Sequence, residues 1–236
     1  RVFKFGGASV KSAEAVRNVA NIIKRYSNDK LLVVVSAMGK TTNALEEVTD
    51  ALHEGDFENF RKLVQIQKDF HLKIINELFE DTTLPIYKDI QDVFNDLGNR
   101  VNVKFAENYD FEYDQIVSLG ELVSTKIIAA YLSHVDINTQ WLDARLLVRT
   151  DNKYRYADVN WSKSDLLISN AIVSNPDKRV FVSQGFIGHT NEGFTTTLGR
   201  EGSDFSAAIF AYALNATDVT IWKDVPGMLN ADPKWF

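Results

Sequence analysis

The first 35 residues place a strand, a glycine turn, a helix and a buried strand in close succession. Val2–Phe5 is a short β-type segment that stops at Gly6-Gly7, and Ser12 is suited to cap a helix with apolar residues at helical spacing. Leu31–Val35 is continuously apolar, which is typical of a strand covered on both faces, as in a parallel sheet. This order predicts a βαβ unit and therefore an α/β fold.

The composition excludes several classes of protein. The 236 residues carry 26 basic and 32 acidic side chains, a net charge of −6, and no cysteine. An acidic balance without a basic run argues against nucleic acid or an anionic membrane as the main partner. The absence of cysteine excludes a disulfide framework, thiol catalysis and a Cys-ligated zinc site. Because the sequence opens on Arg1 without an initiator Met and shows no signal-peptide pattern, we expect trimmed ends and a cytoplasmic location.

A long helical stretch separates the first strands from the later ones. Residues from about 42 to 134 contain four successive apolar stripes at helical spacing, which predicts a helical portion inserted between sheet strands. Beyond it we expect strands at Ile137–Leu142, Leu146–Arg149, Val180–Ser183 and Val219–Trp222, a hairpin over Gln184–Thr197 and a helix over Gly202–Leu214. The pattern predicts one α/β domain.

Two glycine-containing segments could bind anions. In the first, Lys4 ends a strand and Gly6-Gly7 precede a helix, so that backbone N–H groups and an ammonium could face a phosphate; a plain turn with a surface lysine is the alternative. Gly39-Lys40-Thr41 resembles the end of a Walker A loop, but Val34 stands where that loop needs glycine. In the second segment, Arg200 suits bidentate capture of a carboxylate or phosphate.

Other candidate residues have plainer alternatives when taken alone. Asp204 stands in the first turn of a predicted helix, where it could simply complement the helix dipole. Glu121 could be a solvated helix charge, and Trp222–Gly227 could be a turn that closes a hairpin rather than a ligand-binding loop. The four histidines show no metal-ligand spacing, and we expect all of them at the surface: His53, His71, His134 and His189.

Six ordered segments together resemble the catalytic domain of the aspartate kinases, within the amino acid kinase family. They are KFGGASV at 4–10, VVVSAMGKTTNAL at 33–45, LGELVST at 119–125, FVSQGFIG at 181–188, TTLGREGSDFSAA at 196–208 and WKDVPGMLNADPK at 222–234. The resemblance implies an αβα sandwich around a largely parallel eight-stranded sheet. It also implies transfer of the ATP γ-phosphoryl group to the β-carboxylate of L-aspartate, the first step toward lysine, threonine and methionine.

The resemblance also implies roles for individual residues. Lys4 and Asp204 would be catalytic, with Lys4 on the transferring phosphate and Asp204 organising the lysines. The residues that would hold aspartate are Thr42, Glu121, Arg200 and Ser203. Those that would line the ATP site, with Lys4, are Gly6, Gly7, Ser9, Ser36, Lys223, Asp224 and Lys234. No resident metal is implied, because Mg²⁺ would arrive on the nucleotide phosphates.

Two substitutions and the end of the chain depart from the family pattern. Glu201 stands where many relatives have glycine, and we expect it to point away from the substrate; Leu229 replaces a frequent tyrosine near the nucleotide. Residues 1–236 match a kinase domain that is truncated at its C-terminal end, before a second phosphate-directed lysine and the regulatory ACT domains. A homo-oligomer, a dimer, is expected. The alternatives are glutamate 5-kinase, acetylglutamate kinase and a non-catalytic ligand-binding module.

Overall fold

The core of the molecule is a parallel five-stranded sheet. The structure is a computed structural model, and it describes residues 1–26, 28–199 and 201–223. The strand order is β3-β4-β2-β1-β7, and every neighbouring pair is parallel. The strands are β1 (Val2–Phe5), β2 (Leu31–Val35), β3 (Thr139–Leu142), β4 (Val180–Gln184) and β7 (Val219–Trp222).

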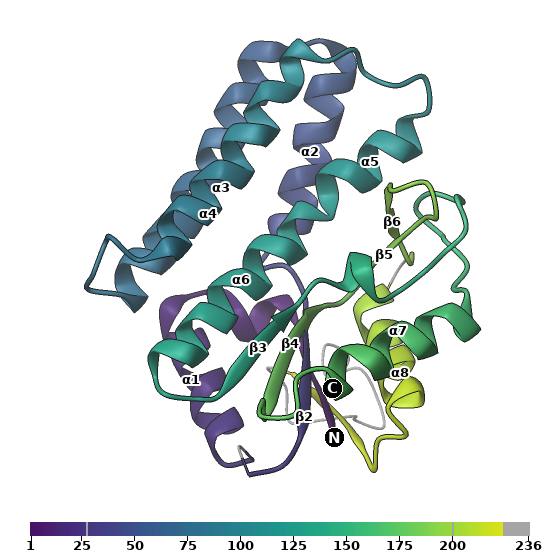
Figure 1. Cartoon of the computed structure of the whole chain (residues 1–236). Coiled ribbons are helices and arrows are strands. Elements are labelled where there is room, and N and C mark those ends of the chain that lie inside the picture. Colours follow the sequence, from purple (N-terminus) through teal and green to yellow (C-terminus); the bar gives the residue numbers. More distant parts are fainter. Residues whose placement is uncertain (27, 200, 224–236) are drawn as a thin grey trace, which may run out of the picture.

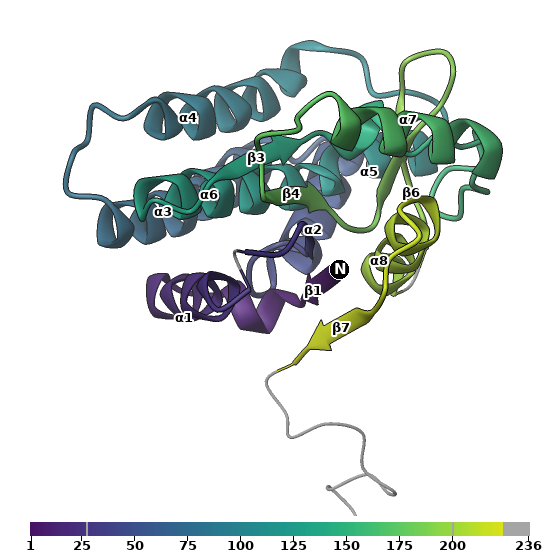
Figure 2. The ribbon, with the colours of Figure 1, turned by 60° about the horizontal axis from the view of Figure 1, so that its bottom comes forward.

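Helices cover both faces of this sheet, as Figures 1 and 2 show. On one face, α1 (Ala13–Lys24) and α6 (Leu119–His134) pack with Phe3 and Phe5 in the larger apolar core. On the other face, α7 (Trp161–Val173) and α8 (Gly202–Ala213) pack with Val2 in a second core. The alternation along β1 therefore follows the two-residue period of a strand.

The three layers confirm the predicted αβα fold with a mostly parallel sheet. Eight strands were expected in this sheet, and the described residues place five in it. Two further strands, β5 (Ile187–His189) and β6 (Thr195–Thr197), form a separate antiparallel hairpin, as predicted for Gln184–Thr197.

Five α-helices lie between β2 and β3 in the sequence. They are α2 (Thr41–Glu54), α3 (Phe57–Leu78), α4 (Pro85–Gly98), α5 (Tyr109–Val117) and α6. In Figure 1, α2, α3 and α4 extend together away from the sheet, while α5 and α6 lead back to it. The fourth predicted helix is thus two helices that meet at Ser118.

The stretch Tyr109–His134, which comprises α5 and α6, is apolar and long enough to cross a membrane by length and composition alone. However, 72% of its most apolar window is buried inside the protein. Packing against the core accounts for its apolar character.

The connection after β3 differs from the prediction. The expected strand over Leu146–Arg149 is instead a short 3-10 turn (Ala144–Leu146) followed by a single bridge between Arg149 and His189. Asp143 caps this turn, because its side chain accepts a hydrogen bond from the backbone N–H of Arg145. Helix α7, which follows, was not predicted.

One histidine prediction is wrong, because His71 is fully buried in α3. Its Nδ1 pairs with the Gln67 carbonyl oxygen at 2.7 Å, and its ring packs beside Phe70 and Phe94. Its Nε2 has no hydrogen-bond partner in the part of the chain that the structure describes. Burial lowers the pKa of His71 from 6.5 to about 4, because the charged imidazole would lose its hydration.

The buried imidazole should make stability depend on pH. The unfolded chain takes up a proton at His71 near pH 6.5, whereas the folded chain does so only near pH 4. The free energy of unfolding should therefore decrease as pH is lowered from 6.5 to 4, by at most about 3 kcal/mol from this group. Denaturant unfolding of His71→Leu should show a flatter pH dependence between pH 6.5 and 4. The exposed control His53→Leu should keep the wild-type slope, and an equal slope in His71→Leu would contradict this assignment.

Candidate functional site

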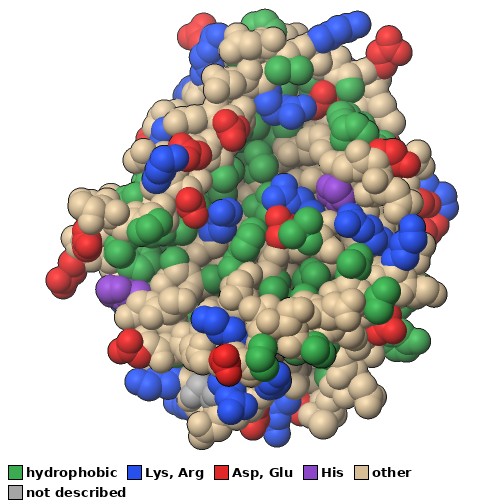
Figure 3. Space-filling model, viewed as in Figure 1, with side chains coloured by type: hydrophobic (Ala, Val, Ile, Leu, Met, Phe, Trp, Pro, Cys, Tyr) green, Lys and Arg blue, Asp and Glu red, His purple; other side chains and the backbone are tan. Residues whose placement is uncertain are grey.

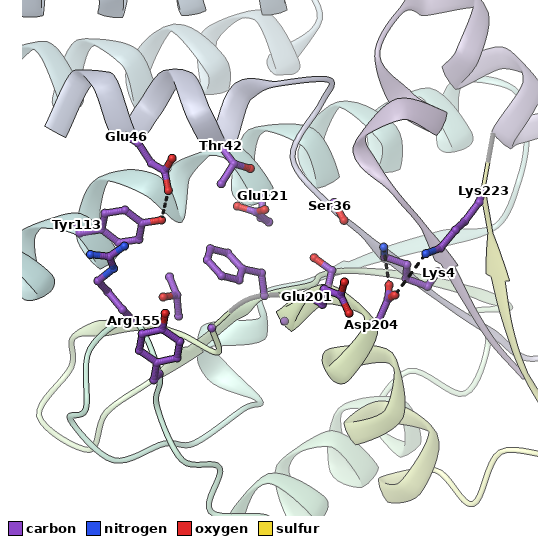
Figure 4. A pocket seen from close by; sticks show the side chains of 16 residues that line it. Lys4, Ser36, Thr42, Glu46, Tyr113, Glu121, Arg155, Glu201, Asp204 and Lys223 are labelled. Carbon is purple, nitrogen blue, oxygen red and sulfur yellow. Dashed lines mark hydrogen bonds and ion pairs between the residues drawn. The ribbon is translucent and has the colours of Figure 1, made fainter. Parts of the chain in front are cut away.

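A cavity of about 450 Å³ opens where β1 and β2 end and where α8 begins. Figure 4 shows its wall: α2 and its neighbours line one side, and the segment that leads into α8 lines the other. On the face of the molecule seen in Figure 3, acidic and basic side chains are interspersed.

An ion pair between a buried lysine and a half-buried aspartate forms one end of the cavity. Lys4 is only 8% exposed, and its Nζ lies 2.6 Å from Oδ1 of Asp204 in the first turn of α8. The exposed Lys223, just after β7, places its Nζ 4.0 Å from the other oxygen of the same carboxylate. One carboxylate thus stands between two ammonium groups (Figure 4), and the plain helix-capping interpretation of Asp204 is insufficient.

The N-terminus of α8 borders the same end of the cavity. Gly202 and Ser203, in the first turn of the helix, line the wall together with Asp204. The N–H groups of Gly202 and Asp204 donate to the carbonyl oxygens of Gly199 and Glu201, and the helix dipole favours negative charge at such an end. Glu201 has a left-handed backbone with φ of 59° and is exposed where it borders the cavity, so the expectation that it points away from the substrate stays a prediction. That backbone conformation is one that glycine adopts without strain.

The predicted glycine turn supports this end of the cavity without lining it. A Cβ atom on Gly6 would lie 3.7 Å from the Lys4 ammonium, so the turn runs beside that group. A Cβ atom on Gly7 would lie 2.5 Å from the carbonyl oxygen of Ala37, so only glycine fits there. Ser9 donates its backbone N–H to the Gly6 carbonyl oxygen at 3.0 Å.

Glu121 lies inside the protein, contrary to the alternative of a solvated helix charge. It is 2% exposed, and its Oε1 accepts a hydrogen bond of 3.2 Å from the Ala37 N–H. Among the described residues its Oε2 has no hydrogen-bond partner, although the residue lines the cavity. Burial raises the pKa of Glu121 to about 8. A buried carboxylate oxygen without a donor is suited to receive a cationic group of a ligand.

The opposite end of the cavity contains residues that the sequence did not single out. Tyr113 of α5 donates a hydrogen bond of 2.5 Å to Glu46 of α2, and the pKa of Tyr113 is raised by burial and by this bond. The guanidinium of Arg155 lies over the Tyr113 ring, 4.2 Å from its centre. The remaining wall residues not yet named are Tyr156, Phe186, Thr197 and Gly199. Phe186, Thr197 and Gly199 lie in segments that carry the family resemblance. The other residues of this end lie in none of the six segments and come from separate elements: Glu46, Tyr113, Arg155 and Tyr156.

The structure brings seven of the predicted site residues together around the cavity: Lys4, Ser36, Thr42, Glu121, Ser203, Asp204 and Lys223. Arg200, Asp224 and Lys234 lie outside the described residues, as does Leu229. In the described part of the chain, no three His, Asp or Glu side chains group as metal ligands.

Comparison with known proteins identifies related sequences. Lysine-sensitive aspartokinase 3 of Escherichia coli (strain K12) is 34% identical over 99% of this chain and 51% of its own length. Aspartokinase 2, chloroplastic, of Arabidopsis thaliana is 32% identical over 98% of this chain and 43% of its own. The chain thus spans about half the length of these relatives or less.

Solved structures and a family model agree with this relationship. The crystal structure of E. coli aspartokinase III in complex with aspartate and ADP superposes with a TM-score of 0.87 at 32% identity, over 99% of this chain and 51% of that one. Clostridium acetobutylicum aspartate kinase gives a TM-score of 0.77 at 26% identity, over 99% of this chain and 49% of that one. The model of the amino acid kinase family matches residues 1–236, and the chain therefore belongs to the amino acid kinase family.

Proposed function

We propose that the protein transfers the γ-phosphoryl group of MgATP to the β-carboxylate of L-aspartate and releases 4-phospho-L-aspartate and ADP. The observation that carries this proposal is the buried, unpartnered oxygen of Glu121 in the same cavity as the Lys4–Asp204 pair. A free amino acid offers an ammonium group for Glu121 and a carboxylate for the cationic end. The similarity to an aspartokinase structure with aspartate and ADP supports the same choice.

The reaction needs little acid–base chemistry. The aspartate carboxylate is ionised at neutral pH, and one of its oxygens attacks the γ-phosphorus while the bond from that phosphorus to the β–γ bridging oxygen breaks. Both electrons of the broken bond leave with ADP. Catalysis then rests on alignment and on cations that stabilise the charge of the transferring oxygens. Lys4, Lys223 and the N-terminus of α8 supply positive potential at this end, and Mg²⁺ enters with ATP.

The polar side chains around the cavity can be divided between the two substrates. Thr42 and Ser203 would contact aspartate beside Glu121, and Ser36 would lie toward the phosphates. Arg200 is proposed for the α-carboxylate, and Asp224 and Lys234 for the nucleotide, together with the turn of Gly6, Gly7 and Ser9. We further propose a dimer in the cytoplasm, with regulatory ACT domains in the part of the relatives that this chain does not span.

Two other activities use the same fold and would differ at Glu121. Acetylglutamate carries a neutral amide in place of the ammonium, so a buried carboxylate without a donor disfavours it. Glutamate retains the ammonium and is one methylene longer, which makes it the closer rival to aspartate. A non-catalytic module would bind ATP and aspartate without turnover.

A coupled ADP-release assay with aspartate, glutamate and acetylglutamate tests the proposal. The full-length protein should release ADP with aspartate and MgATP, and far more slowly with the other two acceptors. Turnover confined to glutamate would replace the proposed substrate. Binding of aspartate and ATP without turnover would support the non-catalytic module.

Removal of either member of the Lys4–Asp204 ion pair should reduce turnover strongly. Lys4→Ala and Asp204→Ala should each lower kcat at least about a hundredfold, as expected when an electrostatic contact in the transition state is lost. The exposed Lys11, in the connection after β1, provides a control of the same type. Lys11→Ala should stay within about twofold of wild type, and wild-type turnover in Lys4→Ala would remove Lys4 from the site.

Aspartate binding should strengthen as Glu121 ionises. Because the pKa of Glu121 is raised to about 8, the protonated form dominates at pH 7 and must lose its proton to pair with the substrate ammonium. KM for aspartate should therefore fall as pH rises from 6.5 to 8.5, and Glu121→Gln should raise KM at least about tenfold at pH 8.5. The variant should also lose this pH dependence. If its KM profile matched wild type, Glu121 would not contact the ammonium.

A further inference from the structure

A second buried carboxylate, Asp114 of α5, lies behind the cavity wall and has no place in the reaction described above. It is fully buried, and three protein donors point at it. The Thr197 hydroxyl donates to Oδ1 at 2.7 Å, and the backbone N–H groups of Thr197 and Arg155 each donate to Oδ2 at 2.9 Å. One side chain thus joins α5, the end of β6 and the loop that precedes α7.

Both segments held by Asp114 border the cavity. Thr197 lines the wall and is two residues before Gly199, after which the chain leads into α8. Arg155 lines the wall at the other end and has a left-handed backbone, with φ of 68°. For a residue with a side chain this conformation is strained, and its N–H bond to Asp114 helps to hold it.

The two segments also pack against each other. A Cβ atom on Gly199 would lie 2.8 Å from the Tyr156 ring and 3.4 Å from the Arg155 carbonyl oxygen. The loop at 155–156 therefore forms the surface on which the turn before α8 rests. Aspartate, the proposed phosphoryl acceptor, would lie between Glu121 and this loop. A shift of the loop would therefore change the space that is left for aspartate.

We propose that Asp114 is a positioning residue for the amino-acid end of the cavity, acting through Thr197 and Arg155. This inference rests on the proposed function for the identity of the acceptor. Asp114 does not touch the substrate. It fixes the distance between the wall that carries Arg155 and Thr197 and the helix that carries Tyr113. Burial raises its pKa to about 6, so the ionised form that accepts three hydrogen bonds prevails at neutral pH.

Steady-state kinetics of the full-length protein separate positioning from simple structural support. Asp114→Asn keeps the shape of the side chain but replaces one acceptor oxygen by a donor that faces N–H groups. KM for aspartate should rise about tenfold or more, while KM for MgATP stays within about twofold. A residue needed only for stability would lower the active fraction and leave both KM values unchanged, and that result would overturn the proposal.

Two further variants keep the test clear. Asp110→Asn is the matched control, because Asp110 lies on α5 and is exposed, and its polar partner among the described residues is the Arg155 guanidinium, at 3.4 Å. Its KM for aspartate should stay near that of wild type. Thr197→Val removes one donor to Asp114 and should raise KM for aspartate by about threefold, and less than additively when combined with Asp114→Asn. If Asp114→Asn does not fold, an unchanged KM in Thr197→Val overturns the proposal.

Hydrogen exchange distinguishes a failure of this inference from a failure of the proposed function. The amides of Arg155 and Thr197 should exchange faster in Asp114→Asn than in Asp110→Asn, without any substrate. If wild type does not phosphorylate aspartate, the proposed function fails, and hydrogen exchange still tests whether Asp114 holds the segments of Arg155 and Thr197. If wild type phosphorylates aspartate but both amides exchange equally fast in Asp114→Asn and in Asp110→Asn, Asp114 does not position these segments.

Discussion

The ion pair between Lys4 and Asp204 is the interaction on which the site depends. β1 places Lys4 on the face of the sheet covered by α8, and the first turn of α8 brings Asp204 to within 2.6 Å. A buried ammonium without a partner would be costly, so the strand end and the helix start fix each other's position. Because Lys223 approaches the same carboxylate, two ammonium groups face one carboxylate, and one positive charge is left over at the place where phosphates would enter.

The wall of the cavity contains a buried carboxylate, Glu121, whose ionisation is unfavourable in the absence of a ligand. Glu121 is buried, and from the other residues that the structure describes its carboxylate accepts one hydrogen bond, from the Ala37 N–H; its raised pKa reflects the cost of ionising it there. This cost would be offset when a substrate ammonium arrives. Because the pKa of the folded state lies above that of the unfolded chain, the contribution of Glu121 to stability is present at low pH and is lost as pH rises through about 8. The ionised Glu121 that would bind the aspartate ammonium therefore destabilises the ligand-free protein in the same pH range.

The sequence predicted the parts of the site that are encoded locally. Lys4 follows a strand signal, and Asp204 stands at a helix start, so their elements could be placed from pattern alone. The resemblance added Glu121, whose burial no local pattern indicated. Glu46, Tyr113 and Arg155 could not be predicted, because they meet only through the packing of α2, α5 and a loop with a left-handed residue. His71 was misplaced for a related reason, since burial of a polar residue on a helix depends on what packs over it.

The central claim is that one cavity presents the aspartate β-carboxylate to the γ-phosphorus of ATP. Its product would be an acyl phosphate, which hydroxylamine converts to a hydroxamate. Full-length protein incubated with L-aspartate, MgATP and hydroxylamine should form aspartyl hydroxamate in proportion to the ADP released. Release of ADP without hydroxamate would show that phosphate is transferred elsewhere and would contradict the account.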